Sequence, residues 1–203
     1  MRNRIAMAAA ALVLFAASWM VLSYARWVRQ IDRANHALQA GDSKTAVQGY
    51  EAAAARAISA PPHPRSVWRR LIFNHARALY GLRDYDGLSR MLESEMVRAL
   101  GDDPELHFWL GNLEYRAAQA QTEKQAMRAA FERAANSYRL GLSAAPDDWD
   151  LKYNYELAAS QADSLRKKEE QTEKLKRGEM KVLREDTDKP KEPQMKLSPA
   201  KRS

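Results

Sequence analysis

The sequence predicts an all-α protein: an N-terminal transmembrane helix, then a short helical-repeat array, then a capping helix. Three observations support this prediction. The middle of the chain is rich in Ala, Leu, Arg and Glu and poor in β-branched residues, which favours helix over strand. Small and aromatic residues recur there at helical offsets, and an apolar N-terminus contrasts with a charged C-terminus. We therefore expect one modest helical domain between two very different ends.

The first segment is an uncharged run from Ile5 to Ala25, long enough to cross a bilayer as a helix of about 20 residues. Trp19, Tyr24 and Trp27 suit the interfacial zone where aromatic rings anchor a span. A cleavable signal peptide is the competing interpretation, since Ser23-Tyr24-Ala25 has the small residues of a cleavage site. The length of the run and its bulky end favour an uncleaved anchor at residues 1–25.

The orientation of this anchor follows from its short basic N-terminus. Arginines flank the apolar run on both sides, so the positive-inside rule does not decide the orientation by itself. Short basic N-termini of this type usually stay in the cytoplasm. We expect a single-pass protein of the bacterial inner membrane with the bulk of the chain in the periplasm.

Residues 26–164 are predicted to form the repeats and their cap. A first helix pair runs from about Trp27 to Ile58, with a turn at Gly41-Asp42-Ser43. A second pair begins near Ser66, and it is the weakest because Leu88 stands where a small residue is expected. A third pair opens at Asp103-Pro104, which suits a helix start.

The last parts of the chain are a predicted cap, an extension and a tail. The spacing of Gly111 and Ala134 indicates long helices in the third pair, or a short insertion around residues 119–124. A helix from Asp147 to about Ser164 is expected to cover the open end of the array. Residues 165–203 are predicted to form a charged helical extension and then a disordered tail containing Pro190, Pro193 and Pro199.

No catalytic or metal-binding motif is evident. The chain has no Cys, which excludes disulfides, thiol nucleophiles and thiolate metal sites. Its four histidines, His36, His63, His75 and His107, lack metal-ligand spacing. The net charge of +7 is spread among mixed signs and is typical of a solvated helical surface. We therefore expect no enzyme, no cofactor and no nucleic-acid partner.

A partner-binding groove is the more plausible functional site. Each predicted first helix carries one asparagine, whose amide offers both a donor and an acceptor to the backbone of an extended peptide. Neighbouring aromatic residues and arginines are types enriched at binding hot spots, although packing between helices is an alternative role for each. The predicted groove consists of Asn35, Arg70, Phe73, Asn74, Arg77, Tyr80, Phe108, Asn112, Tyr115, Arg116, Tyr153 and Asn154.

Over roughly Trp27 to Ser160 the helix pairs resemble the tetratricopeptide family. Ala134, Tyr138 and Pro146 match positions 20, 24 and 32, counted on its roughly 34-residue repeat. With the anchor, the charged tail and the phrase from Asp148 to Ala158, the chain is similar to proteins encoded beside MoxR-type ATPases and von Willebrand factor A proteins, above all the MxaK-type members of methanol-oxidation clusters.

This resemblance implies a membrane-anchored adaptor that assists the maturation of a periplasmic complex, such as metal loading of methanol dehydrogenase. The partners so implied are a MoxR-type ATPase, von Willebrand factor A proteins or a periplasmic dehydrogenase. The alternative is a structural subunit of an inner-membrane complex that binds through its anchor or its convex face.

Overall fold

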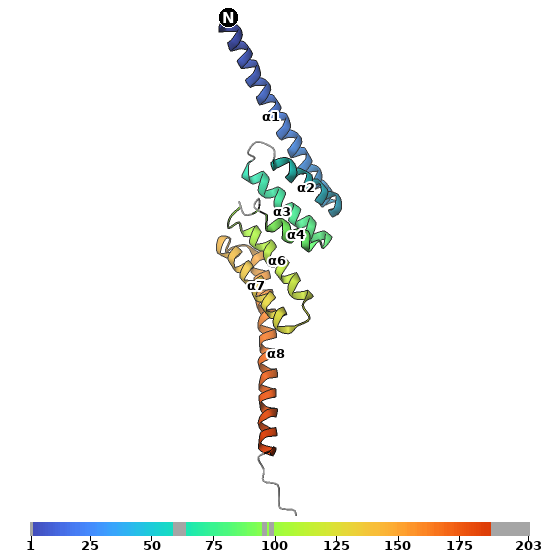
Figure 1. The fold of residues 1–203 in the computed structure, drawn as a ribbon, viewed down its shortest axis with the longest axis vertical. Helices are drawn as coiled ribbons and strands as arrows, with labels where there is room; N and C mark the ends of the chain where they lie inside the picture. Colours follow the sequence, from blue (N-terminus) through green and yellow to red (C-terminus); the bar gives the residue numbers. More distant parts are fainter. Residues whose placement is uncertain (1, 59–63, 95–96, 98–99, 188–203) are drawn as a thin grey trace, which may run out of the picture.

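The structure is a computed structural model and describes residues 2–58, 64–94, 97 and 100–187. Within these ranges the fold is all-α, as predicted, and contains no strand. Figure 1 shows an elongated molecule in which the first and last helices project from opposite ends of a packed middle. The helices are α1 (Arg2–Gln39), α2 (Ser43–Ile58), α3 (Arg65–Leu82), α4 (Tyr85–Leu92), α6 (Pro104–Ala120), α7 (Lys124–Ala144) and α8 (Trp149–Thr187).

Helix α1 joins the apolar N-terminus to the packed middle as one uninterrupted helix of 38 residues. Every side chain from Met7 to Leu22 is exposed, and by length and composition α1 can cross a membrane. Farther along, Trp27 is only 1% exposed, and its indole N–H donates to the carbonyl of Ala53 at 2.8 Å. The predicted boundary at residue 25 therefore lies inside a helix, with no linker between the apolar segment and the core.

Two helix pairs, α1 with α2 and α6 with α7, pack closely because small residues lie where the helices cross. A Cβ added to Gly49 would lie 2.8 Å from the Cβ of Ala34 on the facing helix. A Cβ added to Gly111 would lie 2.5 Å from Cε1 of Tyr138. Both separations are too short for a real side chain, so glycine is what permits the contact.

The pair between them, α3 with α4, is uneven. Helix α4 has only 8 residues, whereas α3 has 18. Leu88, which stands at the place of the expected small residue, is fully buried, and Leu92 is 5% exposed. Asp84 caps α4 by accepting a hydrogen bond from the N–H of Gly87 at 2.8 Å. These apolar contacts and the cap hold a helix that is too short to be stable by itself.

The core is divided between two halves of the packed middle. Helices α1 to α4 share one apolar cluster, to which Trp109 of α6 contributes, while α6, α7 and α8 form two smaller clusters. At the junction, Arg69 of α3 holds both carboxylate oxygens of Asp103, at 2.5 and 3.0 Å, and also contacts Glu105 at 3.1 Å. Asp103 in turn caps α6.

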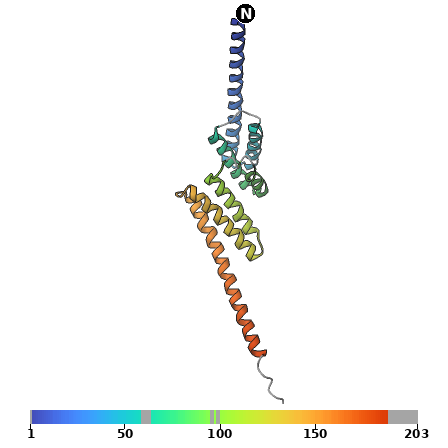
Figure 2. The same cartoon turned by 60° about the vertical axis from the view of Figure 1, so that its left-hand side comes forward.

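Helix α8 is both a cap and an arm. Leu151, Ala158 and Ala162 pack onto the rest of the molecule, and Arg128 of α7 pairs with Glu169 at 3.0 Å. Beyond Glu169 every described side chain is exposed, so α8 runs through the range predicted as a charged extension and projects into solvent (Figure 2). The predicted disordered tail with Pro190, Pro193 and Pro199 lies outside the described residues.

Candidate partner-binding site

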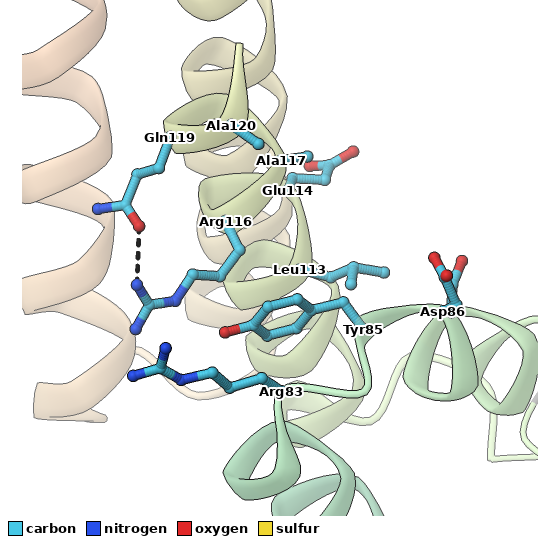
Figure 3. Close-up of a pocket in the computed structure, with 10 residues that line it drawn as sticks. Arg83, Tyr85, Asp86, Leu113, Glu114, Arg116, Ala117, Gln119 and Ala120 are labelled. Atoms are coloured by element: carbon cyan, nitrogen blue, oxygen red, sulfur yellow. Dashed lines mark hydrogen bonds between the residues drawn. The ribbon is translucent and has the colours of Figure 1, made fainter.

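A cleft of about 730 Å³ lies between α4, the turn before it and the C-terminal half of α6 (Figure 3). It forms because α4, at about 12 Å, is roughly half as long as α6 and leaves part of that helix uncovered. The lining residues are Arg83, Tyr85, Asp86, Ser89, Leu113, Glu114, Arg116, Ala117, Gln119 and Ala120.

Arg83 enters this cleft from an unusual backbone conformation. It follows the last residue of α3 with a φ of 60°, in the left-handed region where Gly is the common residue. Its N–H donates to the carbonyl of Tyr80, and the N–H of Asp84 donates to the carbonyl of Leu79, both at 3.0 Å, which is the Schellman arrangement in which helices commonly end. An arginine in this conformation costs roughly 1 kcal/mol relative to glycine. The helix cap explains the backbone of Arg83, and its place on the lining of the cleft makes its side chain a candidate for function.

Arg116 is held in place by its neighbours on the other side of the cleft. Its Nε donates to the hydroxyl of Tyr80 at 2.8 Å, and its Nη1 donates to Oε1 of Gln119 at 2.8 Å. The guanidinium also lies 5.5 Å from the centre of the Tyr80 ring. The hydrogen bond that Arg116 donates to the Tyr80 hydroxyl is the main reason that the pKa of Arg116 lies above its ordinary value.

The two guanidinium groups lie at the same end of the cleft, beside the ring of Tyr85 (Figure 3). Among the described residues, neither Arg83 nor Arg116 forms an ion pair with a carboxylate. Glu114, on the same lining, is engaged elsewhere: it accepts from Ser137 at 3.1 Å and faces Arg133 at 3.6 Å. Burial raises the pKa of Glu114. Asp86, the other carboxylate of the lining, lies on the side away from the guanidinium groups in Figure 3. The end with Arg83 and Arg116 therefore offers two cations and an aromatic ring to a carboxylate-bearing ligand.

Three of the four predicted groove asparagines hydrogen-bond inside the protein. Oδ1 of Asn35 accepts from the hydroxyl of Tyr50 at 2.7 Å and from Nδ2 of Asn74 at 2.8 Å. Oδ1 of Asn112 accepts from the hydroxyl of Tyr138 at 2.8 Å. These amides thus help to fasten one helix to another. Asn154 is half-buried and makes no side-chain hydrogen bond within the described part of the chain.

The asparagine–tyrosine bond recurs at equivalent places in two helix pairs. In α1 with α2 and in α6 with α7, the first helix supplies the acceptor and the second helix supplies the hydroxyl. In α4 the corresponding position is Leu92, which has no hydroxyl, and Asn74 bonds to Asn35 instead. The spacing of the tyrosines was visible in the sequence, but their pairing with the asparagines was not anticipated.

Four other predicted groove residues pack among helices. Phe73 is 2% exposed because it lies in the apolar cluster of α1 to α4, so its assignment to a surface groove is wrong. Phe108 lies against the rings of Trp109 and Tyr138, with centres 5.3 and 6.4 Å away. Tyr115 packs edge-on to Phe131 at 5.1 Å, and Tyr80 packs against Trp109 at 5.7 Å.

The remaining predicted residues are spread over the surface. Arg70 and Arg77 are exposed on α3, and Tyr153 is 65% exposed on α8. Of the whole predicted set, the structure brings Arg116 to the cleft together with Tyr80, which supports it from behind. Arg83, Tyr85 and Gln119 were missed. Arg83 and Tyr85 stand in a stretch that sequence patterns identify only as a turn, and the arginine at a place favoured by glycine was the one available signal.

Within the described ranges, no group of three or more His, Asp or Glu residues is placed to hold a metal ion. In comparisons with known proteins, no family model matches the chain and no curated protein is significantly similar to it. The geometry of the cleft and of the helix pairs is therefore what bears on function.

Proposed function

We propose that this protein is a membrane-anchored helical adaptor that holds a partner protein by an acidic segment in the cleft between α4 and α6. The observation that carries the proposal is the pair of guanidinium groups of Arg83 and Arg116, which share one cleft and have no carboxylate partner among the residues that the structure describes. Planar guanidinium groups bind carboxylates through two parallel hydrogen bonds. Arginine and tyrosine are also the residues that most often dominate binding energy at interfaces.

Two features support an adaptor built from tetratricopeptide-like repeats. The asparagine–tyrosine bond recurs in two helix pairs, as expected when one structural unit is used more than once. In addition, α1 passes from an apolar, exposed segment directly into the core, which would hold the cleft at a fixed height above a membrane. We place the bulk of the chain in the periplasm because the short N-terminus is basic.

The resemblance to MxaK-type proteins indicates which partners should be tested first. These are a MoxR-type ATPase, von Willebrand factor A proteins and a periplasmic dehydrogenase such as methanol dehydrogenase. In this proposal the adaptor assists their assembly, and metal loading is a function of the complex rather than of residues in this chain.

Cross-linking from inside the cleft tests the proposal. A photoreactive benzoylphenylalanine replaces Ala117, an exposed lining residue, in the full chain in its native membranes. We expect cross-links to an acidic segment of one partner, and at least a tenfold loss of this product when Arg83 and Arg116 are both changed to Ala. The control removes the same charge elsewhere, by changing the exposed Arg56 and Arg90 to Ala. Equal cross-linking in the two double variants would refute the proposal.

The alternative, a structural subunit that binds through its anchor or convex face, makes a different prediction. Exchange of residues 2–22 for an unrelated transmembrane sequence keeps Trp27 and the core intact. An adaptor should retain its partner after this exchange, whereas a subunit that binds through the anchor should lose it. Retention of the partner in both the exchange and the Arg83 and Arg116 variant would favour the convex face.

A further inference from the structure

The start of α8 has the side-chain pattern of the first helix of a pair. In α6, three positions face α7. The Cβ of His107 lies 3.2 Å from a Cβ built on Gly141. Gly111 lies against the ring of Tyr138, and Oδ1 of Asn112 accepts a hydrogen bond from the Tyr138 hydroxyl. The same spacing on α8 falls on Trp149, Tyr153 and Asn154. No helix that follows α8 is described.

Helix α8 is fixed to the molecule by its opposite side. Leu151 is 1% exposed, and its Cδ2 lies 2.8 Å from a Cβ built on Gly141 of α7. Trp149 and Tyr153, by contrast, are 77% and 65% exposed. Two large aromatic side chains one helical turn apart thus face solvent, next to an asparagine whose equivalents Asn35, Asn74 and Asn112 all form hydrogen bonds. Exposed aromatic pairs of this kind mark interaction surfaces.

We propose that an amphipathic helix of another protein docks on Trp149, Tyr153 and Asn154, much as α4 docks on α3, where Phe73 and Asn74 stand at the positions of Tyr153 and Asn154. The pair α3 with α4 shows what such a helix needs: apolar side chains, such as Leu88 and Leu92 at 0% and 5% exposure, that pack in one cluster with the aromatic residue. The rim of the surface is mainly acidic: Asp147, Asp148, Asp150 and Glu156 are exposed around it, against Lys152, whose ammonium lies 5.2 Å from the centre of the Trp149 ring. A helix with basic residues beside its apolar stripe complements this charge.

A second copy of this chain fits less well as the occupant. It would have to offer a second helix, but in each copy Tyr50 and Tyr138 are buried, at 0% and 1% exposure, against their own first helices.

The test uses benzoylphenylalanine at position 153 in the full chain in native membranes. The matched control carries it at position 175, since Leu175 is equally exposed, at 68%, on the solvated arm of the same helix. We expect position 153 to cross-link to a helical segment of another protein at least ten times more than position 175. Cross-links to a second copy of this chain, or equal yields at both positions, would overturn the proposal.

The cross-linked segment is then synthesised as a peptide, and its binding to the purified full chain is measured by fluorescence anisotropy. We expect Trp149→Ala combined with Tyr153→Ala to weaken binding at least tenfold, and Asn154→Ala to weaken it at least threefold. Leu175→Ala and the cleft variant with Arg83→Ala and Arg116→Ala should change it less than twofold. Unchanged affinity in the first two variants would overturn the docking surface, whatever happens at the cleft. Because Trp149 and Tyr153 are exposed, these substitutions should leave the melting temperature unchanged; Tyr153→Ser alone is a milder second variant.

Discussion

The hydroxyl of Tyr138 should contribute more to stability than the hydroxyl of Tyr50, although both are buried and both donate to an asparagine. Tyr138→Phe removes the donor at 2.8 Å from Oδ1 of Asn112, and no other described group donates to that oxygen. Losing a hydrogen bond and leaving a partly buried acceptor unsatisfied costs about 1–2 kcal/mol. Tyr50→Phe removes a similar bond, at 2.7 Å, but Oδ1 of Asn35 keeps the amide of Asn74. We expect this second change to cost about 0.5–1 kcal/mol.

Hydrogen–deuterium exchange with mass spectrometry resolves the two sites, because it reports the stability of each helix separately. Amides of α6 and α7 should exchange roughly 5–30 times faster in Tyr138→Phe, while those of α1 and α2 change less in Tyr50→Phe. The double variant with Tyr50→Phe and Asn74→Ala should lose about as much free energy of unfolding as Tyr138→Phe. Tyr153→Phe, at an exposed position, is the control and should have no effect. A larger effect of Tyr50→Phe than of Tyr138→Phe would refute the assignment of Asn74 as a second donor to Asn35.

Three further predictions concern pH, packing and processing. Burial lowers the pKa of His75 from 6.5 to about 4. Between pH 6.5 and 4 the imidazole therefore binds a proton in the unfolded chain but not in the folded one. The free energy of unfolding should fall by up to about 3 kcal/mol as the pH drops through this range. His75→Leu should flatten this part of the urea midpoint–pH curve, and an unchanged curve would exclude His75 as its cause. Gly111→Ala should lower the melting temperature, because the added Cβ meets the ring of Tyr138 and the free energy of unfolding falls by about 1–2 kcal/mol. Gly178→Ala is the control and should have no such effect, since nothing lies within 4 Å of its Cβ. Equal effects of the two substitutions would contradict the clash. Ala25 lies inside a continuous helix, and its carbonyl accepts a hydrogen bond from Arg29 at 3.2 Å, so we expect no cleavage after it. The mass of the purified protein, measured by mass spectrometry, should include the apolar N-terminus. A mass that corresponds to a chain starting at Arg26 would show cleavage.

The sequence predicted the helical class and most helix positions because these depend on local chemistry. Proline and glycine interrupt the chain at recognisable places, and Asp103 with Pro104 marks the start of α6, where both are found. The length of α4 was harder to foresee, because it ends at Leu92 without a proline or glycine next to it. Whether an aromatic residue faces solvent or core was also hidden: Phe73 and Tyr153 stand at equivalent positions, one before an asparagine, but among the described helices only α3 is followed by a second helix.

The candidate site depended on contacts between distant parts of the chain, which explains why little of it was predicted. Arg116 was recognised as a binding type of residue, but its support by Tyr80 spans 36 positions in the sequence. Arg83 becomes informative only once the structure places it on the lining of the cleft. The asparagines were recognised as a recurring feature and given a role in peptide binding, whereas three of them bond to neighbouring helices. Recurrence in a sequence shows that a position is used repeatedly without showing whether the use is structural or functional.

The absence of a hinge between the apolar segment and the core gives the molecule the mechanics of a lever. Helix α1 enters the core without a break, and beyond Glu169 α8 leaves the opposite end as a free arm about 27 Å long. With α1 in a bilayer, a change of about 20° in its tilt, within the range that transmembrane helices adopt, would displace the tip of α8 by about 20 Å relative to the start of this helix, which is about 58 Å long in all. Bilayer thickness would then set the region that the charged end of α8 can sweep, and so which neighbours in the membrane it can reach.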